Sequence, residues 1–192
     1  MKREDNSFKI YTKQGDEGKT GLLYGGRISK SDLQTEAYGT TDEAVSCLGL
    51  ARALSNEALL KNITKRIQKE LFTVGAELAT RRSEYDTLLK HFSVITEKMT
   101  SSIEDDIDSL ERQITLPRSF ILPGASAASA AFDLARSTIR RAERRVVEMN
   151  NQNMIENQEL LKYLNRVSDL IFMMARYEDR NLPFEILTGE ND

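Results

Sequence analysis

The chain has 192 residues, a length that allows one domain with a sizeable core and is marginal for two. Hydrophobic residues make up 40% and charged residues 30%, and the net charge of −3 argues against broad nucleic-acid binding. The single cysteine, Cys47, excludes an intrachain disulfide framework and favours a reducing compartment. The single histidine, His91, nearly excludes His-based catalysis and a zinc cluster.

The charged start of the chain, Met1 to Ser7, lacks the apolar stretch of a secretory signal peptide. No run of 18 apolar residues offers a membrane span either. We therefore expect a cytoplasmic protein with no membrane or nucleic-acid partner. No internal repeat or linker divides the chain, so residues 1–192 are expected to form a single domain.

A loop rich in glycine, lysine and threonine follows a short apolar start near residue 10. Its end, Gly18-Lys19-Thr20, is similar to a P-loop, but that pattern requires a glycine where Lys13 stands and a helix where the glycine-rich Thr20–Arg27 follows. Glycines let a backbone wrap around a phosphate and lysines neutralise it, so the loop is a candidate anion-binding segment. A glycine-rich surface turn with solvated lysines is the alternative.

The remainder of the chain shows the apolar periodicity of five helices. They are expected at about residues 41–54, 56–80, 97–114, 126–149 and 158–180. Thr41-Asp42-Glu43 would supply the N-terminal cap and acidic first turn of the first helix. Five amphipathic helices with short connections predict an all-α, up-down bundle, ferritin-like in outline.

Three polar residues of the helix at 126–149 lie on one stripe away from its apolar side. Arg136, Arg140 and Glu143 are spaced i, i+4 and i+7, so their side chains stack along one line. Two arginines one turn apart can grip separate phosphates, and Glu143 can hold one guanidinium in place. A solvated helix face with weak ion pairs is the alternative, because each such pair contributes only a few tenths of a kcal/mol.

The helix at 158–180 carries a second polar stripe beside its core seam, formed by Asn165, Asp169, Phe172 and Arg176. This stripe suggests a polar site at a bundle groove or at a subunit contact. Capping and surface pairing are the simpler explanation, and Phe172 is more typical of a core than of a ligand platform. Cys47 is expected to be a small buried hydrophobe.

Five segments of the chain, in this order, resemble the ATP:cob(I)alamin adenosyltransferases of the propanediol-utilisation type. They are Ile10–Gly18, Glu36–Glu43, Phe120–Gly124, Arg140–Arg145 and Leu164–Asp169. Together they cover the chain from Lys9 to about Tyr177, and five motifs in order are highly specific. Two departures are small: Ala125 stands where members often carry a second glycine, and Gln14 where they often carry Thr or Asn.

The resemblance implies a cobalamin adenosyltransferase domain over residues 1–192, with an N-terminal ATP-binding loop at 1–34 and a helical bundle at 41–180. It implies a homotrimer with active sites between neighbouring subunits. It also implies that cobalt(I) of reduced cobalamin attacks the 5′ carbon of ATP, giving adenosylcobalamin and triphosphate. Because cobalamin supplies the nucleophile, the protein needs positioning and cations rather than a Ser-His or Cys-His pair. Magnesium is expected on the phosphates, held largely by ATP.

The resemblance also assigns individual residues. Eleven match nucleotide-site positions: Thr12, Lys13, Gln14, Gly15, Thr20, Lys30, Arg140, Arg141, Glu143, Arg144 and Asn165. Asp42 and Arg136 match a salt bridge across the subunit interface beside the site. Phe120 matches an aromatic side chain that lies against the corrin face and keeps out the lower axial ligand, which makes cobalt easier to reduce. Arg136, Arg140, Asp42 and Phe120 are thus the residues expected to act in catalysis.

Two other functions remain open from the sequence. A non-catalytic, ATP-gated carrier of adenosylcobalamin would use the same residues without steady release of triphosphate. A purely structural bundle with an arginine-rich face would fail to bind ATP at millimolar concentration. Beyond ATP and reduced cobalamin, the expected partners are a reductase or an adenosylcobalamin-dependent enzyme.

Overall fold

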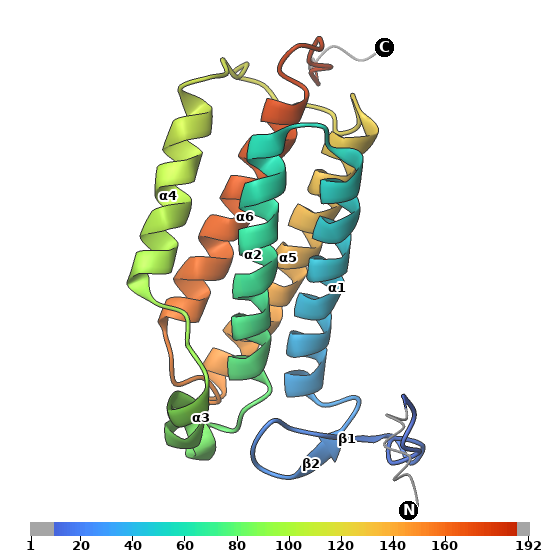
Figure 1. The fold of residues 1–192 in the computed structure, drawn as a ribbon, viewed down its shortest axis with the longest axis vertical. Coiled ribbons are helices and arrows are strands. Elements are labelled where there is room, and N and C mark those ends of the chain that lie inside the picture. Colours follow the sequence, from blue (N-terminus) through green and yellow to red (C-terminus); the bar gives the residue numbers. More distant parts are fainter. Residues whose placement is uncertain (1–9, 188–192) are drawn as a thin grey trace, which may run out of the picture.

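The computed structural model describes residues 10–187; residues 1–9 and 188–192, including the charged start of the chain, lie outside the described part. Residues 10–187 form six α-helices, one short 3-10 helix and a two-stranded sheet. The elements are β1 (Lys19–Gly21), β2 (Arg27–Ser29), α1 (Leu33–Leu54), α2 (Ala58–Leu78), η1 (Arg82–Glu84), α3 (Tyr85–His91), α4 (Glu97–Glu111), α5 (Ala127–Asn151) and α6 (Glu159–Glu178). The long helices run along one axis, and α3 lies at the end of the bundle near the hairpin (Figure 1).

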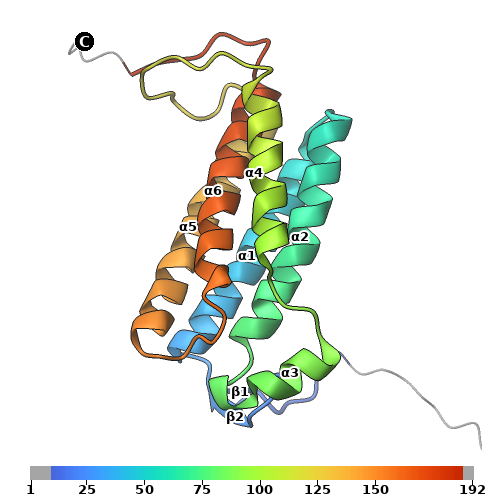
Figure 2. The same cartoon turned by 90° about the vertical axis from the view of Figure 1, so that its left-hand side faces the viewer.

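The long helices alternate in direction and pack around one apolar core (Figures 1 and 2). Helix α1 packs on α2 and α5, and α6 packs on α5 and α4. Leu48, Ile67, Ile103, Phe132 and Leu170, one from each long helix, are fully buried there. None of the helices within residues 10–187 is both long and apolar enough to cross a membrane.

The prediction of five helices was wrong by one, because it did not include α3. This helix has seven residues, of which only Leu88 is buried. An apolar period cannot be recognised over two turns with a single buried position. The four later long helices, α2, α4, α5 and α6, lie within about three residues of their predicted bounds.

The predicted start of the first helix was also wrong. Helix α1 begins at Leu33, eight residues before Thr41, and its N-cap is Asp32, whose carboxylate accepts a hydrogen bond of 2.9 Å from the Gln34 backbone N–H. Asp42 therefore lies near the middle of α1 and not in its first turn.

Tertiary packing explains this longer helix. Gly39, Thr40 and Thr41 have weak helix propensity, so the sequence suggests a break there. In the structure both threonines are buried, and their hydroxyls donate to the carbonyl oxygens of Glu36 and Ala37 at 2.7 and 2.9 Å. Burial against the core and satisfied hydroxyls outweigh the propensity cost of a few tenths to about 1 kcal/mol per residue.

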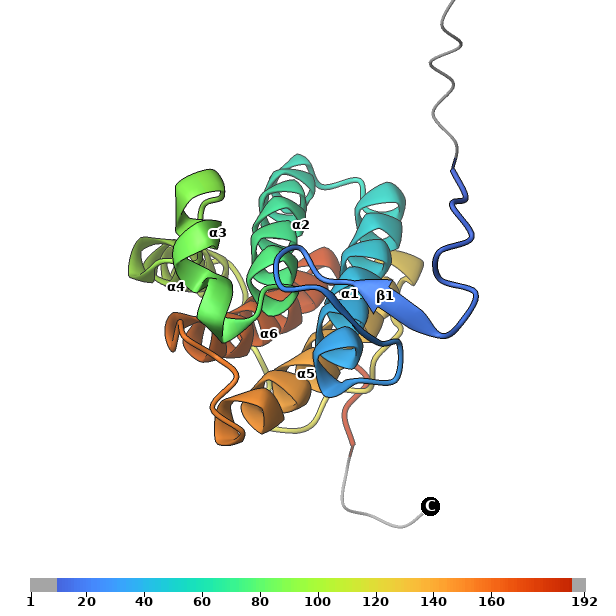
Figure 3. The same ribbon diagram turned by 90° about the horizontal axis from the view of Figure 1, so that it is seen from below.

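The hairpin β1–β2 is attached to the end of α2. Thr20 lies opposite Ile28 in the antiparallel pair. Beyond β1, the Leu23 backbone N–H donates to the Ala79 carbonyl at 2.9 Å, and Tyr24 forms a single bridge with Thr80. Seen along the bundle axis, the hairpin crosses the end at which α1 begins (Figure 3). The N-terminal loop is thereby fixed to one end of the bundle.

Candidate functional site

The loop from residue 12 to residue 20 is exposed and turns twice through left-handed backbone. Lys13 has a φ of 60° and Gly18 a φ of 73°. Gly18 adopts this conformation without a side-chain clash, whereas for Lys13 it costs about 1–2 kcal/mol. The Lys30 backbone N–H donates to the Gly18 carbonyl at 2.8 Å, which closes the loop against the end of β2. The side chains of Thr12 and Lys13 are left exposed to solvent.

Arg27 on β2 joins the two ends of this loop. Its Nη2 donates to the carbonyl oxygens of Gln14 and Lys19, the latter at 3.1 Å. Lys30 covers Gly15 so closely that a Cβ at that glycine would come within 3.0 Å of the lysine Nζ. A hollow of about 370 Å³ is lined by Lys13, Gln14, Asp16, Glu17, Lys19 and Arg27. The loop thus gathers cations around an exposed, glycine-containing backbone, and the part played by Arg27 was missed from the sequence.

A second hollow, of about 310 Å³, lies between α5 and α6. It is lined by Arg140, Glu143, Arg144, Val147 and Asn165. Asn165 Nδ2 donates to Glu143 Oε1 at 3.3 Å, and Arg144 Nη1 donates to the Arg140 carbonyl at 3.1 Å. The structure therefore brings together four of the residues that the resemblance assigned to the nucleotide site. Two exposed arginines beside one glutamate and one amide can bind and orient an anion.

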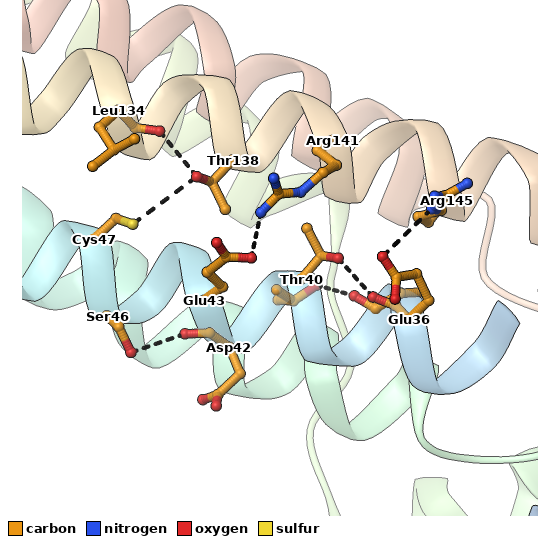
Figure 4. Close-up of polar contacts among 12 residues, drawn as sticks. Glu36, Thr40, Asp42, Glu43, Ser46, Cys47, Leu134, Thr138, Arg141 and Arg145 are labelled. Carbon is orange, nitrogen blue, oxygen red and sulfur yellow. Dashed lines mark hydrogen bonds and ion pairs between the residues drawn. The ribbon is translucent and has the colours of Figure 1, made fainter. Parts of the chain in front are cut away.

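Arg141 lies on a different face of α5. It pairs with Glu43 of α1, and Arg145 Nε lies 3.9 Å from Glu36 Oε1 one turn further along (Figure 4). These partly exposed pairs join α5 to α1 and contribute at most about 1 kcal/mol each. Arg141 does not line the hollow with Arg140, so its assignment to the nucleotide site stays a prediction.

Asp42 and Arg136 lie on opposite sides of the bundle's α1–α5 layer. Asp42 is exposed, points away from α5 (Figure 4) and lines an apolar groove of about 390 Å³ between α1 and α2, together with Phe72 and Phe92. Arg136 faces α6, where its Cζ lies 6.0 Å from the centroid of the Phe172 ring. Within residues 10–187 the two form no ion pair with each other. A bridge between them would have to join two copies of the chain.

Phe120 is 81% exposed on the loop that precedes α5. The C-terminal segment supports this loop: Leu122 N–H donates to the Glu185 carbonyl at 2.8 Å, and Leu187 N–H donates to the Phe120 carbonyl at 2.9 Å. The loop lies at the end of the bundle opposite the hairpin (Figure 2). Its aromatic ring is thus displayed far from the N-terminal loop of the same chain.

Arg176 occupies a position that sequence reasoning did not anticipate. The polar stripe on α6 suggested a place at the edge of the core, but the side chain is only 2% exposed and pairs with Asp133 of α5. The sequence did contain one signal for this buried ion pair, namely Asp133. It is an acid three residues before Arg136, on a helix face that also carries core residues.

The two cationic hollows define the chemistry that the chain can offer. Neither lining contains a histidine or a cysteine. Residues 10–187 also hold no group of three or more His, Cys, Asp or Glu side chains that could bind a metal ion. The described surfaces can neutralise and orient a polyphosphate.

Comparison with known proteins gives one consistent result. The family model described as cobalamin adenosyltransferase matches residues 10–178. A corrinoid adenosyltransferase of Citrobacter freundii is 38% identical over 172 residues, which cover 90% of this chain and 96% of that protein. A corrinoid adenosyltransferase of Bacillus subtilis (strain 168) is 42% identical over 175 residues, covering 88% and 86% of the two chains. Among solved structures, a variant PduO-type ATP:corrinoid adenosyltransferase from Lactobacillus reuteri, complexed with cobalamin and ATP, superposes with a TM-score of 0.85 at 34% identity, covering 93% of this chain and 99% of that one.

Proposed function

Because this chain belongs to the cobalamin adenosyltransferase family, we propose that its bundle carries the family's reaction on the surfaces described above. The chain is a corrinoid adenosyltransferase: it transfers the 5′-deoxyadenosyl group of ATP to cob(I)alamin. The cobalt–carbon bond forms as the bond between C5′ and the phosphate oxygen breaks. The electron pair of that broken bond leaves with the triphosphate, and cobalt passes formally from Co(I) to Co(III).

The hollow between α5 and α6 is the observation that carries this proposal for the site. In it Arg140 and Arg144 would stabilise the negative charge that develops on the leaving triphosphate, which is worth several kcal/mol once a neighbouring subunit shields the hollow from water. Glu143 and Asn165, joined at 3.3 Å, fix the geometry between the helices. The lysines and backbone N–H groups of the N-terminal loop hold the rest of the nucleotide.

We place the complete site between subunits of a homotrimer. The supporting observation is that the loop hollow and the α5–α6 hollow share no lining residue within residues 10–187. A head-to-tail interface with closed rotational symmetry would set the loop of one subunit beside α5 of the next. Asp42 and Arg136, unpaired with each other inside one chain, would then form a bridge across that interface.

Phe120 is proposed to face the corrin ring. Its exposure of 81% supports this role, because a bare aromatic side chain on a supported loop is suited to contact an apolar ligand face. By occupying the lower side of the corrin it would keep out the axial ligand, so that cobalt is more easily reduced.

Magnesium is expected to arrive with ATP. The part of the chain that the structure describes holds no group of three or more His, Cys, Asp or Glu side chains for a metal ion, so we expect ATP to supply most of the magnesium ligands. A cytoplasmic, reducing location suits both the single cysteine and the oxygen-sensitive cob(I)alamin. A reductase or an adenosylcobalamin-dependent enzyme would then be the partner.

The test is anaerobic incubation of the protein with ATP, magnesium and chemically reduced cobalamin. We expect the adenosylcobalamin spectrum to appear and triphosphate to be released over many turnovers. A single burst without further triphosphate would support the carrier function instead. Sedimentation at micromolar concentration should show a trimer, and a monomer would contradict the proposed site between subunits.

A further inference from the structure

A buried ion pair joins α5 to α6 directly behind Arg136. The side chains of Arg176 and Asp133 are 2% and 7% exposed, and Arg176 Nη2 donates to Asp133 Oδ2. Removing two charges from water is costly, and apolar residues of similar volume often give equal or greater stability. The pair therefore calls for an explanation other than folding stability.

The same carboxylate also contacts Arg136. Asp133 Oδ1 lies 3.4 Å from Arg136 Nε, while Oδ2 is occupied by Arg176. The Phe172 ring completes the cluster, with its centroid 5.3 Å from the Arg176 Cζ and 6.0 Å from the Arg136 Cζ. Arg136 is thus held by an ion-pair contact at its Nε and by an aromatic ring. The buried Nε makes this contact but no hydrogen bond, and the hydrogen bonds formed among residues 10–187 include none from the terminal nitrogens of Arg136.

The charges of this cluster leave Arg136 available to a second acid. An aspartate alone beside an arginine tends to form a bidentate pair, in which both carboxylate oxygens accept hydrogen bonds from the guanidinium. Here Arg176 holds one carboxylate oxygen, so Asp133 can steer Arg136 without neutralising it. Two guanidinium groups share one carboxylate, and the excess positive charge is directed to the partly exposed Arg136, whose side chain is 30% exposed.

We propose that Asp133, Arg176 and Phe172 are positioning residues, which orient Arg136 so that its free nitrogens meet a carboxylate of the neighbouring subunit. None of the three touches a substrate. The inference rests on the proposed function, because it assigns a purpose to the orientation of Arg136. It adds that this orientation is set by a charged cluster built inside the bundle.

The decisive variant replaces the pair by apolar residues of similar size, Asp133→Leu with Arg176→Met. Each single change leaves a buried charge unpaired and should lower the thermal midpoint. The double variant should regain a midpoint near that of the wild type. Its kcat should nevertheless stay about 10- to 100-fold below that of the wild type, because a small misplacement of a site group is costly. Its trimer should also be weaker, so that dissociation on dilution begins at a higher protein concentration than for the wild type.

Tyr163→Phe is the matched control on the same helix. It removes a buried hydroxyl that donates to Glu70 Oε2 at 2.7 Å, also between long helices. This variant should change the thermal midpoint while leaving kcat and the trimer unchanged. A loss of kcat in this control as large as in the double variant would show that disturbing any buried contact between the helices lowers kcat. That result would overturn the positioning role.

Two further variants make the outcome unambiguous. If the double variant is stable and has wild-type turnover while Arg136→Ala is impaired, the positioning inference is wrong and the role of Arg136 stands. If Arg136→Ala itself has normal turnover, the proposed bridge is wrong. Should the double variant fail to fold, Phe172→Leu, which keeps the ion pair, decides: we expect several-fold lower kcat with little change in midpoint, and wild-type kcat would refute the inference.

Discussion

The arginines of α5 show how one helix distributes a single residue type among three tasks. Neighbouring positions differ by about 100° around the axis, so Arg140 and Arg141 face different helices, whereas Arg136 lies one turn before Arg140 on the side of α6. Arg140 lines the hollow beside α6, Arg141 pairs with Glu43 of α1, and Arg136 lies against Phe172. An arginine-rich sequence therefore does not by itself identify the residues that bind phosphate.

Arg140→Ala should reduce kcat about 100-fold or more while the bundle remains folded. A lost contact to a developing negative charge costs about 3–4 kcal/mol, whereas truncation of an exposed helix arginine changes stability by about 0.5 kcal/mol or less. Single-turnover rates and the thermal midpoint would be measured together. Arg112→Ala, at an exposed arginine on the C-cap of α4, is the control and should leave both unchanged.

Glu77 is a buried acid that joins three segments near the hairpin end of the bundle. Its carboxylate accepts hydrogen bonds from the Ile95 backbone N–H at 2.7 Å and from Tyr85 Oη and Asn157 Nδ2 at 2.9 Å each. Burial raises the pKa of the Glu77 carboxyl above its usual 4.5, and these hydrogen bonds offset only part of that effect. Folding thus shifts the protonation equilibrium of this carboxyl toward its neutral form.

This raised pKa predicts how stability depends on pH. The contribution of Glu77 is fully present below 4.5 and is lost as the pH rises through the higher pKa of the folded state. Denaturant unfolding should therefore show that the wild type loses stability relative to Glu77→Gln as the pH rises above 4.5. Glu111→Gln, at an exposed position, should show no such trend. A flat or opposite difference for Glu77→Gln would contradict a raised pKa at this carboxyl.

At the scale of elements, the start of α1 controls how the N-terminal loop joins the bundle. Asp32 caps the helix three residues after the end of β2, and Gln34 Nε2 donates to the carbonyl oxygens of Leu78 and Thr80 at 2.8 and 3.1 Å. Hairpin, α1 and α2 therefore meet within a few residues. A change at this junction should affect both helix stability and the placement of the loop.

Asp32→Ala should lower the free energy of unfolding by about 1 kcal/mol, the usual value of a lost N-cap. Because the loop is attached at the same point, the KM for ATP should also rise. Asp32→Asn is the matched control, since its amide oxygen can still accept the Gln34 N–H, and it should remain close to the wild type in both measurements. Equal losses in the two variants would indicate that the charge, and not the cap, matters.

At the scale of the whole molecule, the bridge between subunits can be tested by exchanging charges. Asp42→Arg and Arg136→Asp should each reduce turnover and weaken the trimer, and the double exchange should recover part of the loss. A favourable interaction of the Asp42 carboxylate with the helix dipole would not explain these losses, because that interaction requires an acid in the first turn and Asp42 lies near the middle of α1. Recovery should be incomplete, because an aspartate at position 136 would face Asp133. Strictly additive losses would show that the two residues do not meet.

The sequence alone determined the parts of this protein that depend on local periodicity and on motif order. Apolar spacing located α2, α4, α5 and α6 to within about three residues, because long amphipathic helices carry many repeats of one pattern. Five ordered motifs indicated the family, which the match over residues 10–178 confirmed. Helical spacing also placed Arg136, Arg140 and Glu143 on one helix, which the structure shows as α5.

Only the tertiary structure decided the features that depend on burial and on contacts between distant segments. Packing extended α1 across residues of low helix propensity, and Tyr85–His91, for which no helix was expected, forms α3. Packing of α5 on α1 gave Arg141 its partner Glu43, and packing of α6 on α5 buried Arg176 against Asp133. The tertiary structure also decided that the two cationic hollows lie apart within one chain. Helix periodicity indicates which face of a helix is apolar, but the free energy of burying a charge depends on which residue of a neighbouring helix packs against it and pairs with it.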